Sequence, residues 1–169
     1  ITHVLGSELA HVAGARALAC AGLDAKDLDL VVYGSCSNEE LVPNSASGLQ
    51  HRLGAWNAAA MDVNSACTSF LYGLSTATGL IRAGTVRSAL VVGVEKMTDQ
   101  VGAGVEEALA TAADSDYESV QGLTPTAQAA LLMQRYMHEY NVPADGFAGF
   151  ALTAHANGAG NPHAMFRKA

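Results

Sequence analysis

The sequence predicts an α/β fold in which a mostly parallel sheet is flanked by helices. Three short segments, residues 28–34, 57–63 and 88–94, are almost wholly apolar. Segments of helical character separate them, so strands and helices alternate along the chain. Strands of a parallel sheet are buried on both faces, which is why they are continuous apolar runs in sequence. The alternation therefore indicates βαβ units.

The helices that cover this sheet are expected over residues 3–21, 44–53 and 67–83. Apolar residues in the first segment recur at helical spacing, and the third is rich in small residues. Gly22 and Gly84 follow these two segments, and glycine is the residue that most often ends a helix. Both glycines are therefore expected to terminate helices.

The character of the chain changes after residue 99. A polar, small-residue stretch with one short helix is followed by a helix that begins after Thr124 and ends at residues 141–143. A further helix and a Gly/Asn-rich segment complete the chain. We therefore expect a βαβ core over residues 1–99 and a helical domain over residues 100–169.

The composition excludes several classes of function. The net charge is −7 and no Lys/Arg-rich block is present, so nucleic-acid binding is not expected. No apolar stretch approaches the roughly 18–20 residues of a membrane span. The three cysteines form no CxxC pair, so neither a metal site nor a disulfide framework is expected. We expect a cytoplasmic protein in a reducing compartment, with no bound cofactor.

One cysteine stands where a predicted strand passes into a predicted helix. In residues 61–74, MDVNSACTSFLYGL, we expect Cys67 in the first turn of the helix 67–83, at the carboxyl edge of the sheet. Helix N-termini favour a thiolate, and the Cys67 N–H is a natural oxyanion donor. Small neighbours would let a substrate approach: Ser65, Ala66, Thr68 and Ser69. The residues alone leave two interpretations open, a nucleophile or a packed core thiol.

The other two thiols have weaker claims. Cys20 lies on what we expect to be the apolar face of a helix, where core packing is the better interpretation. Cys36 follows a strand near the same sheet edge as Cys67, but no helix begins there. Asp62 and Asn64 flank the Cys67 turn, where a structural role is expected because Asn and Asp bond to neighbouring backbone.

Four segments resemble the thiolase superfamily in order along the chain. Residues 62–99 resemble its nucleophile segment, and residues 21–35 resemble the segment before its second strand. Residues 122–142 and 161–168 resemble the loop domain of sterol-carrier-type thiolases. The resemblance implies a thiolase-like half-fold with a helical loop-domain insertion. It also implies that Cys67 accepts an acyl group from a coenzyme A thioester.

The resemblance carries further expectations. A thiolase-type acyltransferase would form or cleave a 3-ketoacyl-CoA through the Cys67 acyl-enzyme. Family members have two related halves, and the second carries the catalytic His and part of the oxyanion hole, so we expect this chain to be incomplete alone. A homodimer through strand 57–63, or assembly with a complementary chain, is implied. The loop domain is expected to cover the substrate with four residues: Leu123, Thr124, Gln128 and His163.

Three alternatives remain open. The segment ACTSFLYGL is closer to type III ketoacyl synthases, which are condensing enzymes, than to degradative thiolases. The helix with Tyr-Met-His-Glu-Tyr, residues 136–140, favours the sterol-carrier type. A thiolase-like aldolase that does not use the cysteine and a non-catalytic, partner-dependent subunit are the other two alternatives.

Overall fold

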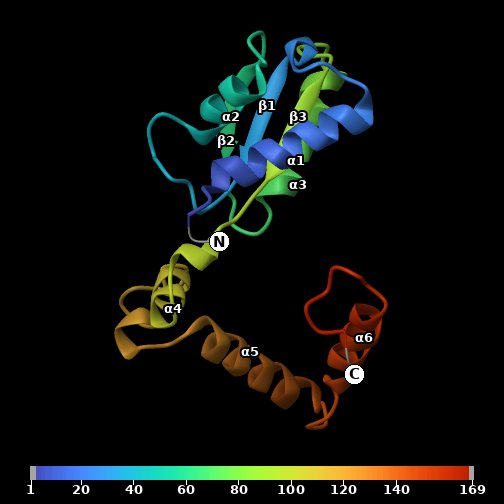
Figure 1. Ribbon diagram of the computed structural model, residues 1–169. Coiled ribbons are helices and arrows are strands. Elements are labelled where there is room, and N and C mark those ends of the chain that lie inside the picture. Colours follow the sequence, from blue (N-terminus) through green and yellow to red (C-terminus); the bar gives the residue numbers. More distant parts are fainter. Residues whose placement is uncertain (1–2, 168–169) are drawn as a thin grey trace. The chain divides into compact units, whose positions relative to one another are not determined.

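The computed structural model describes residues 3–167. The chain divides into two compact units, the first ending at Val101 and the second beginning at Gly102 (Figure 1). This division lies two residues beyond the boundary expected after residue 99. The assignment of these units as a thiolase-like core and a loop domain stays a prediction.

The first unit alternates helices and strands in the predicted order. Its elements are α1 (Gly6–Ala21), β1 (Leu30–Gly34), α2 (Ser45–Leu53), β2 (Ala59–Val63), α3 (Ser69–Arg82) and β3 (Ala89–Gly93), with short 3₁₀ turns at Ala25–Asp27 and Met97–Asp99. The expected strands are each a little longer than the observed ones. Gly22 ends α1 in the left-handed conformation, with φ 64°, as predicted.

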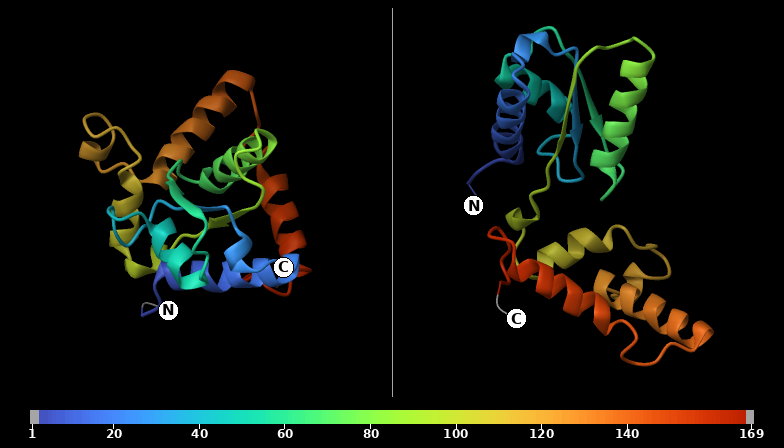
Figure 2. Two further views of the ribbon diagram at one scale, coloured as in Figure 1. Left: turned by 90° about the horizontal axis from the view of Figure 1, so that it is seen from above. Right: turned by 90° about the vertical axis from the view of Figure 1, so that its right-hand side faces the viewer.

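The three strands form one parallel sheet in the order β2-β1-β3. Gly34 at the end of β1 is in register with Val63 of β2 and Gly93 of β3, so all three strands end at one edge. Helices α1 and α2 pack on one face and α3 packs on the other (Figure 2). The expectation of a parallel sheet flanked by helices is confirmed.

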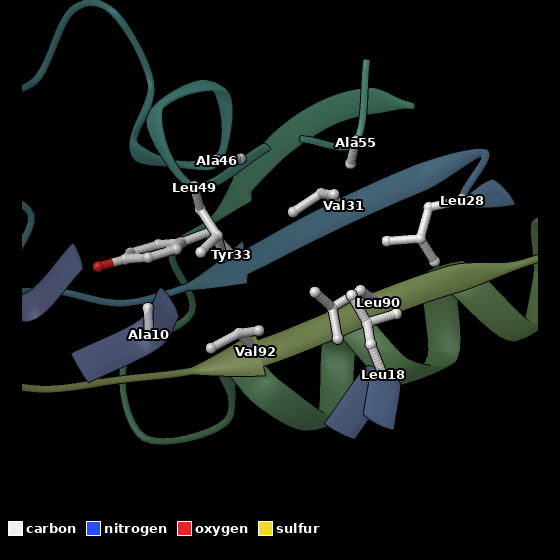
Figure 3. Packing of buried hydrophobic residues seen from close by; sticks show 10 residues of the cluster. All are labelled: Ala10, Leu18, Leu28, Val31, Tyr33, Ala46, Leu49, Ala55, Leu90 and Val92. Carbon is white, nitrogen blue, oxygen red and sulfur yellow. The ribbon is translucent and has the colours of Figure 1, made fainter. Parts of the chain in front are cut away.

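The core lies between the sheet and the α1–α2 layer (Figure 3). The central strand β1 is buried along its whole length. Its side chains Val31 and Tyr33 meet Leu90 and Val92 of β3 and Leu49 of α2 in one cluster. Burial on both faces explains the uninterrupted apolar run that predicted this strand.

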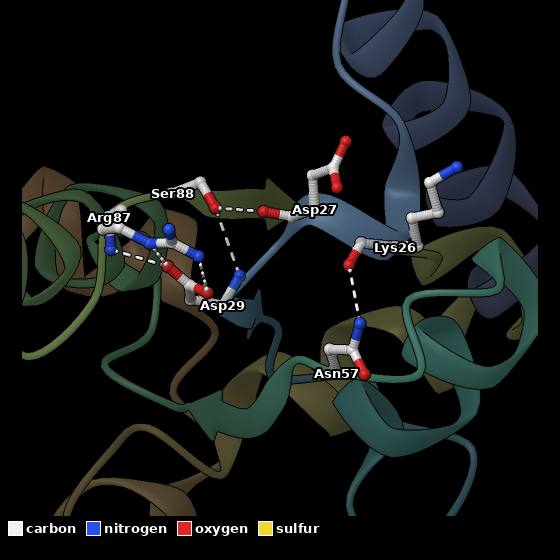
Figure 4. A network of polar contacts seen from close by, with 6 residues as sticks. All are labelled: Lys26, Asp27, Asp29, Asn57, Arg87 and Ser88. Carbon is white, nitrogen blue, oxygen red and sulfur yellow. Dashed lines mark hydrogen bonds and ion pairs between the residues drawn. The ribbon is translucent and has the colours of Figure 1, made fainter.

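A polar network joins the starts of the three strands (Figure 4). The backbone N–H of Arg87 donates to the Asp29 carboxylate at 2.7 Å, and the Ser88 hydroxyl donates to the carbonyl of Asp27 at 2.7 Å. The Asn57 amide donates to the carbonyl of Lys26 at 3.0 Å. The hydrogen bonds from Arg87, first from its backbone and then from its side chain, lower the pKa of Asp29. The network fixes the amino edge of the sheet, opposite the edge that carries Cys67.

The second unit consists of helices without a buried core. Its helices are α4 (Ala103–Ala110), α5 (Pro125–Tyr140) and α6 (Ala148–Ala159), with a 3₁₀ turn at Ser119–Gln121. Thr124 caps α5 by accepting from the N–H of Ala127 at 3.2 Å, and Asn141 ends α5 with φ 51°. Within residues 102–167 no residue is buried. In the part of the chain that the structure describes, no helix is both long and apolar enough to cross a membrane.

Candidate functional site at the carboxyl edge of the sheet

The turn between β2 and α3 carries Cys67 and has a defined backbone. The N–H groups of Thr68 and Ser69 donate to the carbonyls of Ser65 and Ala66, at 3.2 and 3.1 Å. Ala66 has φ 49°, in the left-handed region that a residue with a Cβ rarely adopts. Such conformations cluster at functional sites.

The expectation that Cys67 lies in the first turn of the helix is wrong by two residues. Helix α3 begins at Ser69, with Thr68 as its N-cap residue. The left-handed Ala66 cannot be part of a right-handed helix, so the helix starts after the turn is complete. Cys67 therefore stands on the approach to the helix N-terminus.

Ser69 holds this turn together. Its hydroxyl accepts from the N–H of Ser65 at 2.9 Å and donates to the carbonyl of Ala66 at 2.7 Å. The residue is only 4% exposed. It was expected to be one of the small residues beside a substrate, but its hydroxyl is used to brace the backbone on either side of Ala66.

Glycines let α3 lie close to the sheet. A Cβ added at these glycines would come within 3.1 Å of atoms that are already there. The contacts join Gly34 to Ser69, Gly93 to Phe70, and Gly73 to Val32 and Val91. Because backbone and side-chain carbons cannot approach much closer, larger residues here would shift α3 and with it the Cys67 turn.

Cys67 combines an accessible thiol with an available backbone donor. The thiol-bearing residue is exposed, so the interpretation as a packed core thiol is wrong. Among residues 3–167, no hydrogen bond from the Cys67 N–H is found. Cys67 thus has the two groups that a nucleophile with its own oxyanion donor would use.

A second thiol lies at the same edge, as expected for Cys36. Its backbone N–H donates to Glu95 at 2.6 Å, and the Ser37 hydroxyl donates to the other oxygen of that carboxylate at 2.5 Å. Burial, then the charge and hydrogen bond of Glu95, and then Cys67 raise the pKa of the Cys36 thiol. A hydrogen bond from the backbone of Ala66 acts in the opposite direction. Nothing in the sequence pattern marks Glu95 for this role, since it lies far from Cys36 in the chain.

The expectation that Cys20 packs in the core is wrong, because this residue is exposed. Helix α1 buries a stripe that includes Ala10, Gly14 and Leu18. Successive residues are about 100° apart around a helix, so a residue two positions after Leu18 faces roughly the opposite way. Cys20 therefore points away from the sheet.

Asp62 has the structural role that was expected. Its carboxylate accepts from the N–H groups of Ser45 and Ala46, at 2.9 and 2.8 Å, and from the side chain of Asn38 at 3.1 Å. A carboxylate on the first N–H groups of a helix satisfies unpaired donors and favours the helix dipole. Asp62 thus ties β2 to the start of α2. The Asn64 side chain accepts from the Ala66 N–H at 3.4 Å, within the turn.

The other predicted site residues all belong to the second unit. Leu123 is half-buried, Thr124 caps α5, and the Gln128 amide donates to Glu118 at 3.1 Å. The N–H of His163 donates to Asn161 at 2.9 Å. A pocket of about 260 Å³ in this unit is lined by Ala154, His155, Gly158, Ala164, Met165 and Phe166. His163 is adjacent to Ala164 in the chain but does not line the pocket. The role of these residues toward a substrate of Cys67 stays a prediction.

A protein-family model covers nearly the whole chain. Residues 2–169 match the family model described as "Thiolase, N-terminal domain". β-Ketoacyl-(acyl-carrier-protein) synthase III 2 of Vibrio cholerae serotype O1 is 50% identical over 98 residues, which are 58% of this chain and 27% of the relative.

Solved structures of condensing enzymes are also similar to this chain. 3-Oxoacyl-(acyl-carrier-protein) synthase III from Aquifex aeolicus VF5 is similar with a TM-score of 0.57 and 30% identity, over 59% of this chain and 32% of that one. OleA of Xanthomonas campestris, with bound lauric acid and lauroyl-CoA, gives a TM-score of 0.54 and 29% identity, over 56% and 28%. The chain spans about a third or less of the length of these relatives.

These relatives correct one expectation. Two of the three are named as type III synthases, which the segment around Cys67 resembles, and none of the three is named as a sterol-carrier-type thiolase. The segment ACTSFLYGL, which builds the turn, therefore indicates the type of relative better than the helix at residues 136–140 does.

Proposed function

The chain belongs to the thiolase family, and from this premise we propose that it provides the nucleophile-bearing part of a type III condensing enzyme. The observation that carries the proposal is the exposed Cys67 thiol at the carboxyl edge of a parallel sheet, beside its own N–H, for which no hydrogen bond to a described residue is found. Ligands of open α/β sheets bind at this edge. The similarity to synthases of the same family, and to a protein with bound lauroyl-CoA, supports an acyl thioester as substrate.

In the first step, the Cys67 thiolate attacks the carbonyl carbon of an acyl-CoA thioester. A new C–S bond forms, the bond to coenzyme A breaks, and coenzyme A leaves as its thiolate, which takes up a proton from water. The Cys67 N–H donates to the oxygen that becomes negative during the attack. Ser69 contributes as a positioning residue because it holds the backbone on both sides of Ala66.

In the second step, a carbanion from a second thioester attacks the acyl-enzyme. A C–C bond forms and the Cys67 thiolate is released. This step needs a base and a second oxyanion donor, and we propose that both come from outside this chain. Thiolase-type formation or cleavage of a 3-ketoacyl-CoA is the second candidate function, which the family match favours.

Acylation of Cys67 tests the proposal. The chain is incubated with acetyl-CoA and digested with trypsin, which cuts after Arg52 and Arg82 and isolates Cys67 in one peptide. We expect one acetyl group on the peptide 53–82. The Cys67→Ala variant should carry none, and Cys20→Ala is the control that should be acetylated at the wild-type rate. Acetylation that persists on 53–82 after Cys67→Ala, or that favours Cys20, would refute the proposed nucleophile.

A second measurement separates acylation from turnover. General acid–base catalysis contributes typically about 10²–10⁴-fold, and an oxyanion donor on the order of 10²–10³-fold. We therefore expect the 169-residue chain to acylate slowly and to form or cleave no C–C bond with acetoacetyl-CoA plus coenzyme A. Robust, Cys67-dependent thiolysis by this chain alone would show that it contains a base, and would favour the thiolase-type candidate.

A further inference from the structure

Two thiols follow the ends of adjacent parallel strands. Gly34 and Val63 are paired in register, and the N–H of Ser35 extends the ladder by donating to the carbonyl of Val63 at 3.3 Å. Cys36 lies two residues after Gly34, and Cys67 lies four residues after Val63, in the loops that continue β1 and β2. Both residues are exposed.

The two thiols follow neighbouring strands, and neighbouring strands of a sheet lie about 4.8 Å apart. The backbone of Ala66, the residue immediately before Cys67, and Cys67 itself both act on the pKa of the Cys36 thiol, which agrees with this placement. The Cys36 backbone is held in place by its 2.6 Å hydrogen bond to Glu95.

The third thiol lies elsewhere in the unit. Cys20 is in the last turn of α1, and the loop after α1 leads to the start of β1. It is therefore on the amino side of the sheet, whereas the other two follow the carboxyl ends of strands. Cys20 serves as an internal control for any reaction that depends on proximity.

We propose that Cys36 and Cys67 form a reversible disulfide when the protein meets a peroxide, and that this disulfide blocks the nucleophile. The block of acylation rests on the proposed function of Cys67. The cross-link itself depends only on the placement of the two thiols.

The chemistry balances with hydrogen peroxide as the oxidant. The Cys67 thiolate attacks one peroxide oxygen, the O–O bond breaks, and Cys67 becomes a sulfenic acid with release of hydroxide. The Cys36 sulfur then attacks the Cys67 sulfur, an S–S bond forms, and the S–O bond breaks with loss of a second hydroxide. The two hydroxides take up the two thiol protons, so two thiols lose two electrons and one peroxide becomes two waters.

The surroundings of Cys36 favour its role in the second step, the attack on the Cys67 sulfenic acid. Although Cys36 is exposed as a residue, partial desolvation of its sulfur and the neighbouring Glu95 raise its pKa, so at neutral pH it is mainly a thiol. Peroxide reacts with thiolates, which makes Cys36 a slow first target and leaves Cys67 as the site of the initial oxidation.

Peptide mapping of the full chain tests the cross-link. Trypsin cuts after Lys26, Arg52 and Arg82, so Cys20, Cys36 and Cys67 fall on the separate peptides 17–26, 27–52 and 53–82. After brief peroxide treatment and blocking of free thiols, we expect the pair 27–52 and 53–82 to be linked, and dithiothreitol to separate it. Failure to find this link, or links to 17–26 at equal yield, would overturn the proposal.

The acylation assay supplies the second readout. Peroxide should lower acetylation of wild-type Cys67 by about tenfold or more, because only the thiolate is a nucleophile, and dithiothreitol should restore it. In Cys36→Ser no disulfide can form, so peroxide should drive Cys67 to sulfinic acid and the loss should resist dithiothreitol. Equal recovery of the two proteins would contradict a protective role of Cys36. Circular dichroism of Cys36→Ser checks that it is folded.

The two proposals can fail separately. If the disulfide forms but the reduced chain is never acetylated, the proposed function is refuted and the proposed cross-link is supported. If the reduced chain is acetylated but no disulfide forms after peroxide, the cross-link is refuted and the proposed function is supported.

Discussion

A Cβ added at Gly34 would lie 3.1 Å from the Cβ of Ser69, so the end of β1 and the start of α3 are packed more closely than most side chains at position 34 would permit. We expect Gly34→Ala to displace α3 and to destabilise the first unit by about 1–3 kcal/mol, as overpacking generally does. Cys67 should also be acetylated more slowly, since Ser69 braces its turn. Urea denaturation followed by the fluorescence of Trp56 measures the stability.

The matched control is Gly79→Ala on the same helix. A Cβ there meets nothing within 4 Å, so this variant should gain up to about 1 kcal/mol from helix propensity. A Gly34→Ala protein as stable and as reactive as the wild type would show that the contact does not position α3.

Glu95 is expected to control the reactivity of Cys36. Burial raises the pKa of this thiol first, and the charge and hydrogen bond of Glu95 raise it further. Glu95→Gln removes the charge, lowers the pKa of Cys36 and increases its thiolate fraction, by up to about tenfold for each unit of pKa. Iodoacetamide labelling of peptide 27–52 at pH 7.5 should therefore become faster. Glu40→Gln, a neighbouring exposed carboxylate, should leave the labelling rate unchanged, and an equal effect of both variants would exclude a local role for Glu95.

Tyr33 is expected to make the first unit sensitive to alkaline pH. Burial, and then the charges of Glu39, Asp62 and Glu95, raise its pKa from 10.0 to about 12. Its contribution to stability is present below pH 10 and is lost as the pH rises toward 12, because the unfolded chain ionises first. The free energy of unfolding should fall less between pH 10 and 12 in Tyr33→Phe than in the wild type. Tyr72→Phe, at an exposed site, should follow the wild-type curve; a parallel fall in all three proteins would count against this assignment.

Strand β2 is expected to mediate self-association. Among residues 3–167 it pairs with β1 on one side only, and its side chains are exposed or half-buried. The Ala59 N–H donates to the carbonyl of Asp29 on the β1 side, so by alternation the Ala60 N–H points to the open edge. The Ala60 carbonyl accepts from the side chain of Asn44 at 3.3 Å, which leaves the N–H for a partner strand. Open strand edges are templates for such pairing.

Proline at position 60 tests this edge. Ala60→Pro removes the outward donor while the ladder to β1 is kept, and proline is tolerated in this way on edge strands. Light scattering at micromolar concentration should show a dimer for the wild type and a larger monomer fraction for Ala60→Pro. Ala89→Pro, at the start of the opposite edge strand β3, should remain dimeric. A wild-type chain that is monomeric throughout would refute self-association.

The sheet and its helices could be predicted from the sequence because their signals are local. Continuous apolar runs, helical spacing and terminal residues such as Gly22 and Thr124 lie within each element. The prediction that Cys20 is packed in the core was wrong although the helix itself was predicted correctly. The buried face of α1 includes Leu18, and Cys20 is two residues further along, on the opposite face.

The site could be predicted only in part. The sequence marks the turn at Cys67, because a strand and a helix meet there with almost no loop. It does not mark the contacts that hold the turn, such as Gly34 against Ser69 or Glu95 against Cys36, because these residues are distant in the chain and meet only in the folded sheet. The left-handed conformation of Ala66 had no signal at all, since glycine or asparagine is the residue usually found there.

Because no residue of 102–167 is buried, the backbone hydrogen bonds of the helices in this range should open often. An isolated helix of the length of α5 is marginal in water, and its caps at Thr124 and Asn141 supply only part of what packing gives elsewhere. Amide protons of α5 should therefore exchange with deuterium quickly, through local opening. Those of the fully buried β1 should exchange slowly, because their exchange requires unfolding of the first unit. A single labelling time course on one chain would then separate into two populations of amides, divided near residue 101.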